Sequence, residues 1–318
     1  MSKSLAKTIV RRLILAVITV LIVTVIVFFL SHLIPGDPVV NYLGANASEE
    51  QIAYYTHLYG LDQPLIVQYF KWLGGLFTGD MGFSISYQKG VSEIIFDRLF
   101  VTLSVTIPAF IIAVILGIVL GVIAALHRGK LADTVISFIA NIGVSMPLFW
   151  SGMILILVFG LLLRWLPTSS YAYIDEGFVP YVRHLILPVI VCCFHPLATF
   201  TRQTRTALLD VMNQEYVVTA KAKGLKHRAV VFGHMLRNAL IPIITVMGSQ
   251  FGTMVGTTVL IESVFVLPGL GNLMINGINS RDYMVMTGCI LLIAIFVAVC
   301  NLIVDILYTV VDPRVRDK

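Results

Sequence analysis

Six stretches of this chain carry no charged residue and are long enough, or nearly so, to cross a lipid bilayer. The hydrocarbon core of a membrane takes about 20 apolar residues of helix, so each stretch predicts one transmembrane helix. The fourth, with 17 residues, is the shortest. The chain is therefore expected to be an all-α integral membrane protein with six spans. The stretches are Leu13–Leu30, Val101–Leu126, Thr134–Leu163, Leu185–Thr201, Asn238–Ile261 and Tyr283–Val304.

The composition favours a membrane protein over a soluble one. Apolar residues make up 58% of the 318 residues and charged residues 12%, whereas about a quarter of a soluble domain is charged. The first apolar stretch is too long for a secretion signal and is followed by no small-residue cleavage site, so it is interpreted as a retained anchor. The four cysteines lie inside apolar stretches without metal-ligand spacing, so no metal site is expected.

The positions of lysine and arginine predict the orientation in the membrane. With the N-terminus inside, 16 of the 22 basic residues fall in inner segments and 6 in outer segments. Both termini are therefore predicted to be cytoplasmic. The net charge of +5 reflects this asymmetry. It does not mark the basic face of a nucleic-acid-binding protein, so no nucleic-acid partner is expected.

Two segments between the stretches are too long to be simple connectors. Residues 31–98 lie outside in this topology and predict a small extracytoplasmic cap between spans one and two, with a short helix over Ser48–Tyr59. Residues 202–237 form a long basic loop on the inner side. The chain thus divides into residues 1–98, the first span with the cap, and residues 99–318, a five-span core that carries the loop.

Prolines interrupt spans two to five but not spans one and six. A proline inside a helix frees a backbone carbonyl, which is tolerated beside protein or a water-lined cavity. We therefore expect spans two to five to surround a substrate pathway, with spans one and six packed outside. Bending of helices around their neighbours is the alternative.

Polar residues within the apolar stretches are candidates for the pathway, because such residues tend to face a bundle interior or a cavity. Hydrogen bonding between helices is the alternative for each of them. The pathway candidates are the polar residues Asn141, Ser145 and Gln250, together with Pro147, whose kink lies beside the first two. The candidates for a gate or an interface, near the outer end of span five, are Glu262, Pro268 and Gly269.

The inner loop contains a short predicted helix that ends at a glycine. Asn213 is suited to cap its start and Gly224 to the left-handed position after its end, which gives about ten helical residues. Val217, Ala220 and Gly224 form a small face that would suit close docking into a partner protein. An interfacial helix on anionic lipid is the alternative, since the neighbouring lysines suit that as well.

The loop and several other motifs resemble one known family. Residues 215–225 have the pattern Glu-Tyr-Val-x-Thr-Ala-x-Ala-Lys-Gly-Leu, and residues 234–242 follow with His-x-Leu-Arg-Asn-Ala-Leu-Ile-Pro. Further matches are Ile-Pro-Gly-Asp-Pro at 34–38, Gly-Val-Ser-Met-Pro-x-Phe-Trp at 143–150, and Glu-x-x-Phe-x-x-Pro-Gly-Leu-Gly at 262–271. Together they resemble permeases of ABC importers, in particular the dipeptide, oligopeptide and nickel branch. The loop departs from the general permease pattern at Val218 and Thr219, as that branch does.

This resemblance implies a type I ABC-importer permease fold and a defined set of partners. These are a second, homologous permease subunit in a heterodimer, two cytoplasmic ATPase subunits, an extracytoplasmic substrate-binding protein and the bilayer. It also implies the inner membrane of a bacterial or archaeal cell, and a role for the loop around residues 213–225 in coupling to the ATPase. The residues it assigns to coupling are Glu215, Tyr216, Thr219, Ala220, Ala222, Gly224 and Leu225.

The chain is not expected to be an enzyme or to hold a cofactor. It has no G-x-x-x-x-G-K-[ST] phosphate-binding loop, so ATP and Mg²⁺ are expected on the partner ATPases. An ion-coupled secondary transporter is the alternative of another class, although repeated halves and intramembrane carboxylates would be expected of it. Peptides are the favoured cargo, and nickel, metal chelates and glutathione are the alternatives.

Overall fold

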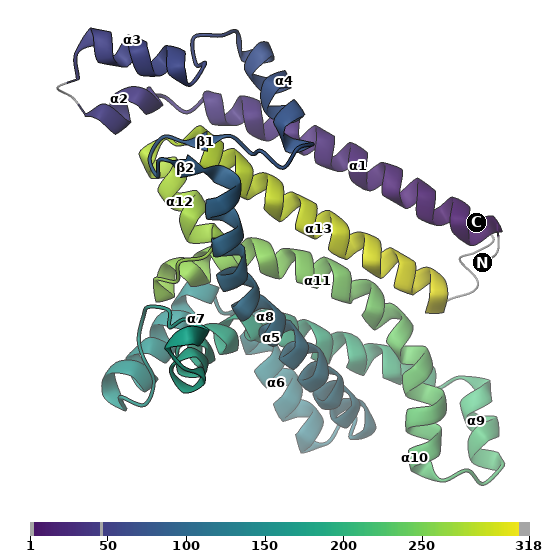
Figure 1. Ribbon diagram of the computed structural model, residues 1–318. Coiled ribbons are helices and arrows are strands. Elements are labelled where there is room, and N and C mark those ends of the chain that lie inside the picture. The colour runs from purple at the N-terminus through teal and green to yellow at the C-terminus, as the bar shows by residue number, and fades with distance from the viewer. Residues whose placement is uncertain (1–2, 45–46, 312–318) are drawn as a thin grey trace.

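The computed structural model describes residues 3–44 and 47–311, and most of them are helical (Figure 1). Among these described residues, five helical segments are long and apolar enough to cross a membrane, and a further pair of helices qualifies only as a bent unit. The fold therefore matches the expected all-α membrane architecture. The helices of these segments are α1 (Lys3–His32), α5 (Val91–Leu126), α6 (Leu131–Ser145), α7 (Leu148–Leu155), η1 (Ile156–Leu162), α8 (Phe178–Met212), α11 (Leu236–Phe265) and α13 (Tyr283–Val311).

The third predicted span is not a single straight helix. The longest charge-free stretch breaks after Ser145, and α6 meets the α7–η1 segment at 106°. Pro147 lacks an N–H to continue the helix and disfavours helical geometry in the residue before it. Met146 accordingly takes extended backbone angles. The third predicted span is therefore present as one bent unit, and the kink expected at Pro147 is confirmed.

The fourth span, which is the shortest in the sequence, belongs to one of the longest helices. α8 runs for 35 residues through Pro188 and Pro196 and lies at the centre of the bundle, against α5, α6 and α11. Glycines bring α5 close to it, since a Cβ on Gly121 would lie 2.5 Å from Cβ of Thr204. Side chains at this seam, such as Phe200, are fully buried.

The first and last spans lie side by side at one edge of the bundle (Figure 1). α1 packs against α13 and α4 (Leu65–Leu76), as expected for a peripheral span. In contrast, α13 also packs against α11 and α12 (Leu270–Ser280), where the side chain of Val304 fills the space beside Gly248. The expectation that span six only packs outside is therefore too simple.

A cap of short elements covers the end of the bundle where α1 finishes. The predicted helix over residues 48–59 is confirmed as α3, and Ser48 and Gln51 form a reciprocal capping box at its start. The Ser84 hydroxyl donates to Asp282 (2.6 Å), which ties the cap to the turn between α12 and α13. The cap consists of α2 (Pro38–Leu43), α3 (Glu49–Leu58), α4 and the antiparallel strands β1 (Phe83–Ser84) and β2 (Lys89–Gly90).

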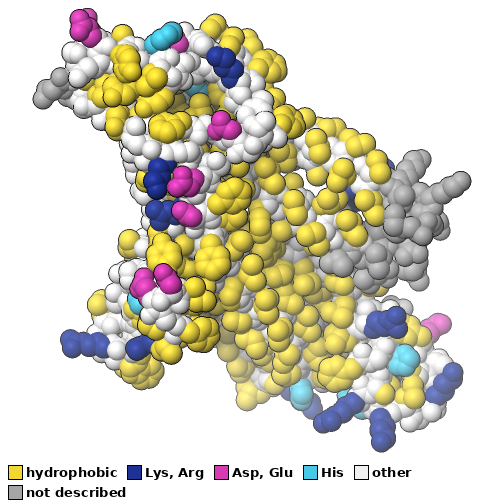
Figure 2. All heavy atoms as spheres, viewed as in Figure 1, with side chains coloured by type: hydrophobic (Ala, Val, Ile, Leu, Met, Phe, Trp, Pro, Cys, Tyr) yellow, Lys and Arg dark blue, Asp and Glu magenta, His cyan; other side chains and the backbone are white. Residues whose placement is uncertain are grey.

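The opposite end of the bundle carries α9 (Glu215–Ala222) and the three-residue α10 (His227–Ala229). A π-helical turn, η3 (Val230–Met235), joins α10 to α11. The start of α1 and the end of α13 lie toward this end (Figure 1). Figure 2 shows hydrophobic side chains across the middle of the visible face, with basic side chains and histidines gathered over α9 and α10.

Candidate functional site

The helix predicted in the inner loop is present as α9, with corrected limits. It has eight residues where about ten are expected, and Gln214 precedes it at the N-cap without a side-chain capping bond. Asn213 instead ends α8, and its amide donates to the Leu209 carbonyl (3.3 Å). The prediction for Gly224 is confirmed, because its φ of +72° lies in the left-handed region that glycine adopts without strain.

The small apolar face of α9 is turned toward the chain itself. Val217 is 0% exposed and Ala220 is 6% exposed, and both pack in a hydrophobic cluster with residues such as Leu208 of α8 and Met235 of η3. The expectation that these two residues form a docking surface is therefore wrong in this structure. Their burial holds α9 against the ends of α8 and α11, because moving α9 away would expose the apolar side chains of Val217 and Ala220 to water.

The face of α9 that remains accessible consists of other residues. Val218 is 60% exposed and Leu225 is 43% exposed, and Ala222 is also exposed one helical turn after Val218. We call Val218, Ala222 and Leu225 the α9 patch. Of these, Val218 is absent from the sequence-based coupling set, although its i, i+4 spacing to Ala222 could have indicated it. Glu215, Thr219 and Gly224 are exposed around the patch.

Two polar contacts stabilise the surroundings of α9. The amide of Asn238, near the start of α11, donates to the hydroxyl of Tyr216 (2.8 Å). Asp133 of α6 accepts two bonds from the guanidinium of Arg205 on α8, at 2.6 and 2.9 Å, and a third from the Gly129 N–H at 3.0 Å. A bidentate arrangement of this kind combines charge with fixed geometry. It joins α6 to α8 near the loop, and no local sequence pattern indicates this pair.

The pathway candidates are dispersed over two helices. Asn141 and Ser145 are exposed on α6, and Pro147 is exposed at the break that follows. Gln250 lies on α11 and is half-buried, and its Oε1 atom is enclosed without a hydrogen-bond partner among the described residues. Both helices pack against α8. That the four candidate residues line a substrate pathway stays a prediction.

The gate candidates converge on one buried carboxylate. Glu262 is 0% exposed, and it accepts hydrogen bonds from the Thr102 hydroxyl (2.6 Å) and the Asn272 N–H (3.0 Å). Gly269 packs directly on this carboxylate, and any Cβ at that position would collide with it. The carbonyl of Pro268 accepts a bond from Arg98 (3.2 Å). Glu262 thus joins α5, α11 and α12 within one chain.

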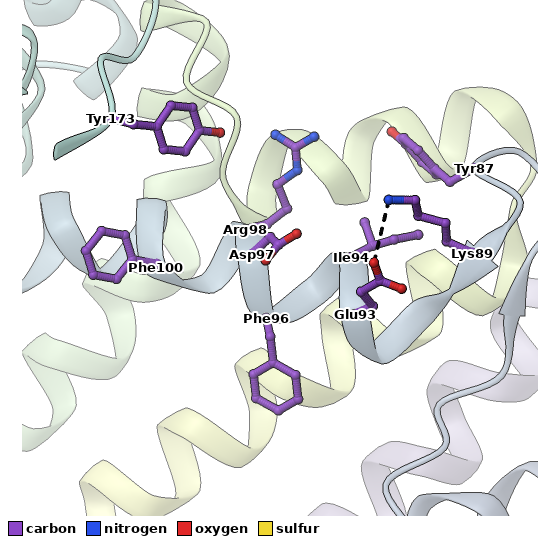
Figure 3. Close-up of a pocket in the computed structure, with 9 residues that line it drawn as sticks. All are labelled: Tyr87, Lys89, Glu93, Ile94, Phe96, Asp97, Arg98, Phe100 and Tyr173. Carbon is purple, nitrogen blue, oxygen red and sulfur yellow. Dashed lines mark ion pairs between the residues drawn. The ribbon is translucent and has the colours of Figure 1, made fainter. Parts of the chain in front are cut away.

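A charged cavity of about 620 Å³ opens beside the start of α5, at the cap end (Figure 3). Lys89 and Glu93 form an ion pair across 3.5 Å, and the side chains of Asp97 and Arg98 lie farther along the helix with Tyr173 beyond them. Both signs of charge are therefore present in the lining of this cavity. The acids were visible in the sequence, but their grouping with Tyr173 required the folded chain.

The long apolar helices, with one bent span among them, define a multi-pass membrane protein. The sequence matches "Binding-protein-dependent transport system inner membrane component" over residues 117–317, and the N-terminal part of the same family over residues 5–106. The chain belongs to this family and is a multi-pass inner membrane protein.

Curated relatives match along nearly the full length. The chain is 42% identical to the di/tripeptide transport system permease protein DppB of Pseudomonas aeruginosa, with 97% of this chain and 98% of that protein covered. It is 39% identical to the oligopeptide transport system permease protein AppB of Bacillus subtilis (98% and 100% covered) and 37% identical to the dipeptide permease DppB of Escherichia coli (98% and 98%).

A solved structure supports the fold. The inward-facing MetNI methionine ABC transporter contains a chain that superposes with a TM-score of 0.57 at 18% identity, covering 69% of this chain and 96% of that one. At this identity the similarity concerns the fold alone. The expected ABC-importer permease fold is thereby confirmed for the matched part.

Proposed function

We propose that this chain is the permease subunit of an ATP-driven importer of short peptides. The observation that carries the cargo class is the full-length similarity, at 37–42% identity, to permeases named for dipeptide, di/tripeptide and oligopeptide transport. Nickel, metal chelates and glutathione remain the alternative cargoes. No feature of the described residues favours one of them over peptides.

The α9 patch is proposed as the contact for a separate ATPase subunit. Three exposed apolar residues with lysines on either side give an apolar centre and a charged rim, which is the usual composition of a protein interface. Val217 and Ala220 fasten the other side of α9 to the ends of α8 and α11. A displacement of α9 by its partner would therefore be passed to two membrane helices at once.

The complete transporter is proposed to contain five chains. They are this permease, a second homologous permease, two ATPases that bind ATP and Mg²⁺, and an extracytoplasmic binding protein that delivers the peptide. Seven lysines and arginines within residues 202–237 support a cytoplasmic position for α9, and the same distribution of basic residues supports cytoplasmic termini. The pathway candidates would face the second permease, and Glu262 would hold α12 at the outer gate.

Uptake in a strain that lacks this chain tests the proposal. Radiolabelled dipeptide, tripeptide and nickel would be supplied in parallel, with and without the plasmid-borne gene and its partner subunits. Restored uptake of the peptides is expected, and it should stop when the ATPase subunits are omitted. Restored nickel uptake without peptide uptake would overturn the cargo assignment. Transport that persists without the ATPases would overturn the importer class.

A further inference from the structure

Helix α4 of the cap has an apolar face that points away from the protein. Ile66 is 62% exposed, Phe70 is 63% exposed and Phe77, just after the helix, is 82% exposed. At 100° per residue these positions, i, i+4 and i+11, fall within about 40° of one another on the helix surface. A water-exposed helix normally places such large side chains inward.

The inward side of α4 is attached to the body of the first span. The hydroxyl of Tyr69 lies 3.1 Å from that of Thr24, and the rings of Tyr69 and Trp72 pack on Phe28 with centroids 5.4 and 5.6 Å away. Thr24 precedes the end of α1 at His32 by eight residues, or about 12 Å of helix. The inward side of α4 therefore contacts α1 well inside the span, as Figure 1 shows for the lower end of α4.

The polar groups of α4 lie on another flank. Gln68 donates to the carbonyls of Leu61 (3.2 Å) and Gln63 (2.8 Å). Gln68 and Lys71 line a cavity of about 500 Å³, and His57 and Asp80 are also part of its lining. The helix is thus amphipathic, with one flank facing a polar cavity of the cap and the other presenting only apolar side chains.

A second apolar feature continues from α4 along the membrane helices. A groove of about 400 Å³ is bounded by Leu76 and Phe77 at one end and descends between α1 and α13. Beside it, the outer surface of α1 exposes residues such as Val25, Ile26 and Leu30, as expected of a lipid-facing helix. The apolar face of α4 is continuous with this lipid-facing surface.

We infer that α4 lies in the lipid interface of the leaflet opposite α9, with Ile66, Phe70 and Phe77 among the acyl chains. The occupant of the surface is membrane lipid, because α4 contacts α1 at membrane depth and the groove leads farther into the bilayer. Aromatic and aliphatic side chains on one face of a short helix are suited to this position. The cap is therefore anchored in the membrane, and α4 holds α1 against α13.

Depth measurements with spin labels test the inference. Single cysteines at Phe70 and Lys71 would be labelled in the full chain, with the four native cysteines replaced by alanine, in nanodiscs of phosphatidylethanolamine and phosphatidylglycerol. The label at Phe70 is expected to collide several-fold more with oxygen, and several-fold less with a water-soluble nickel chelate, than the matched label at Lys71. Equal access of the nickel chelate to both labels would overturn the inference.

Two further measurements separate lipid from a protein partner and from simple misfolding. If the label at Phe70 is open to the nickel chelate until purified binding protein is added, the surface is a protein interface and the inference fails. With the label at Ile66, Phe70→Asp should increase nickel-chelate access, while Phe70→Leu should not. The inference would also be overturned if Phe70→Asp left the access of the nickel chelate to the Ile66 label unchanged, while the mobility of that label stayed the same.

Discussion

Replacement of Glu262 by alanine is expected to destabilise the cap end of the bundle. The buried carboxylate accepts from the Thr102 hydroxyl and the Asn272 N–H, and alanine would leave both donors without their acceptor. A buried donor that loses its partner costs about 1–3 kcal/mol. Two donors therefore give a loss of about 2–6 kcal/mol in the free energy of unfolding.

The conservative variant Glu262→Gln should lower the free energy of unfolding by less than Glu262→Ala does. Its carboxamide oxygen can still accept from the Asn272 N–H, while its NH₂ group can donate to the oxygen of Thr102. That oxygen already accepts from the Leu270 N–H at 2.9 Å, so the hydroxyl proton must find another partner. We expect a loss of about 1–3 kcal/mol in the free energy of unfolding, because one donor, the Thr102 hydroxyl, loses its acceptor.

The assay is unfolding of the purified chain in nanodiscs, followed by tryptophan fluorescence, with peptide uptake measured in parallel. The double variant Glu262→Ala/Thr102→Val should be less destabilised than the sum of its parts, because the two side chains contact each other. Additive losses would show that this hydrogen bond is not made. Wild-type stability in Glu262→Ala would refute the whole account of the junction.

Three other changes test separate parts of the structure. Apart from its two chain neighbours, no atom of the described residues lies within 4 Å of where a Cβ on Gly224 would be, so the constraint at this position is its φ. Gly224→Val should destabilise the loop by about 1–2 kcal/mol and lower uptake, whereas Gly224→Asn should destabilise it less. Equal uptake by both variants at matched expression would contradict this. Gly121→Leu should separate α5 from α8 at Thr204 and cost about 1–3 kcal/mol or more, measured as a lower unfolding temperature than that of Gly121→Ala. Val218→Asp should change the free energy of unfolding by no more than about 0.5 kcal/mol. It should lower ATP-dependent uptake about tenfold, equivalent to ~1.4 kcal/mol. Val218→Leu is its control, and normal uptake by the aspartate variant would exclude the α9 patch as the coupling contact.

Several features of this protein followed from sequence because they depend on short-range physics. The length of an apolar stretch predicts a span whatever its neighbours are, since the bilayer core has a fixed thickness. The start of α3 is set by the local reach of the Ser48 and Gln51 side chains. The left-handed turn at Gly224 needs only the missing Cβ. Each of these signals lies within a few residues of its effect.

The tertiary structure decided which surfaces are hidden and which groups meet. Val217 and Ala220 look like a docking face in sequence, but packing on α8 and η3 buries them and leaves Val218 outside. Pairs such as Asp133 with Arg205 join residues far apart in the chain, and local patterns carry no information about such contacts. Which side of α4 faces the bundle could be seen only once Tyr69 and Trp72 were placed against α1. Burial is a property of the whole packed bundle, so the residues of a functional surface are known only when that packing is known.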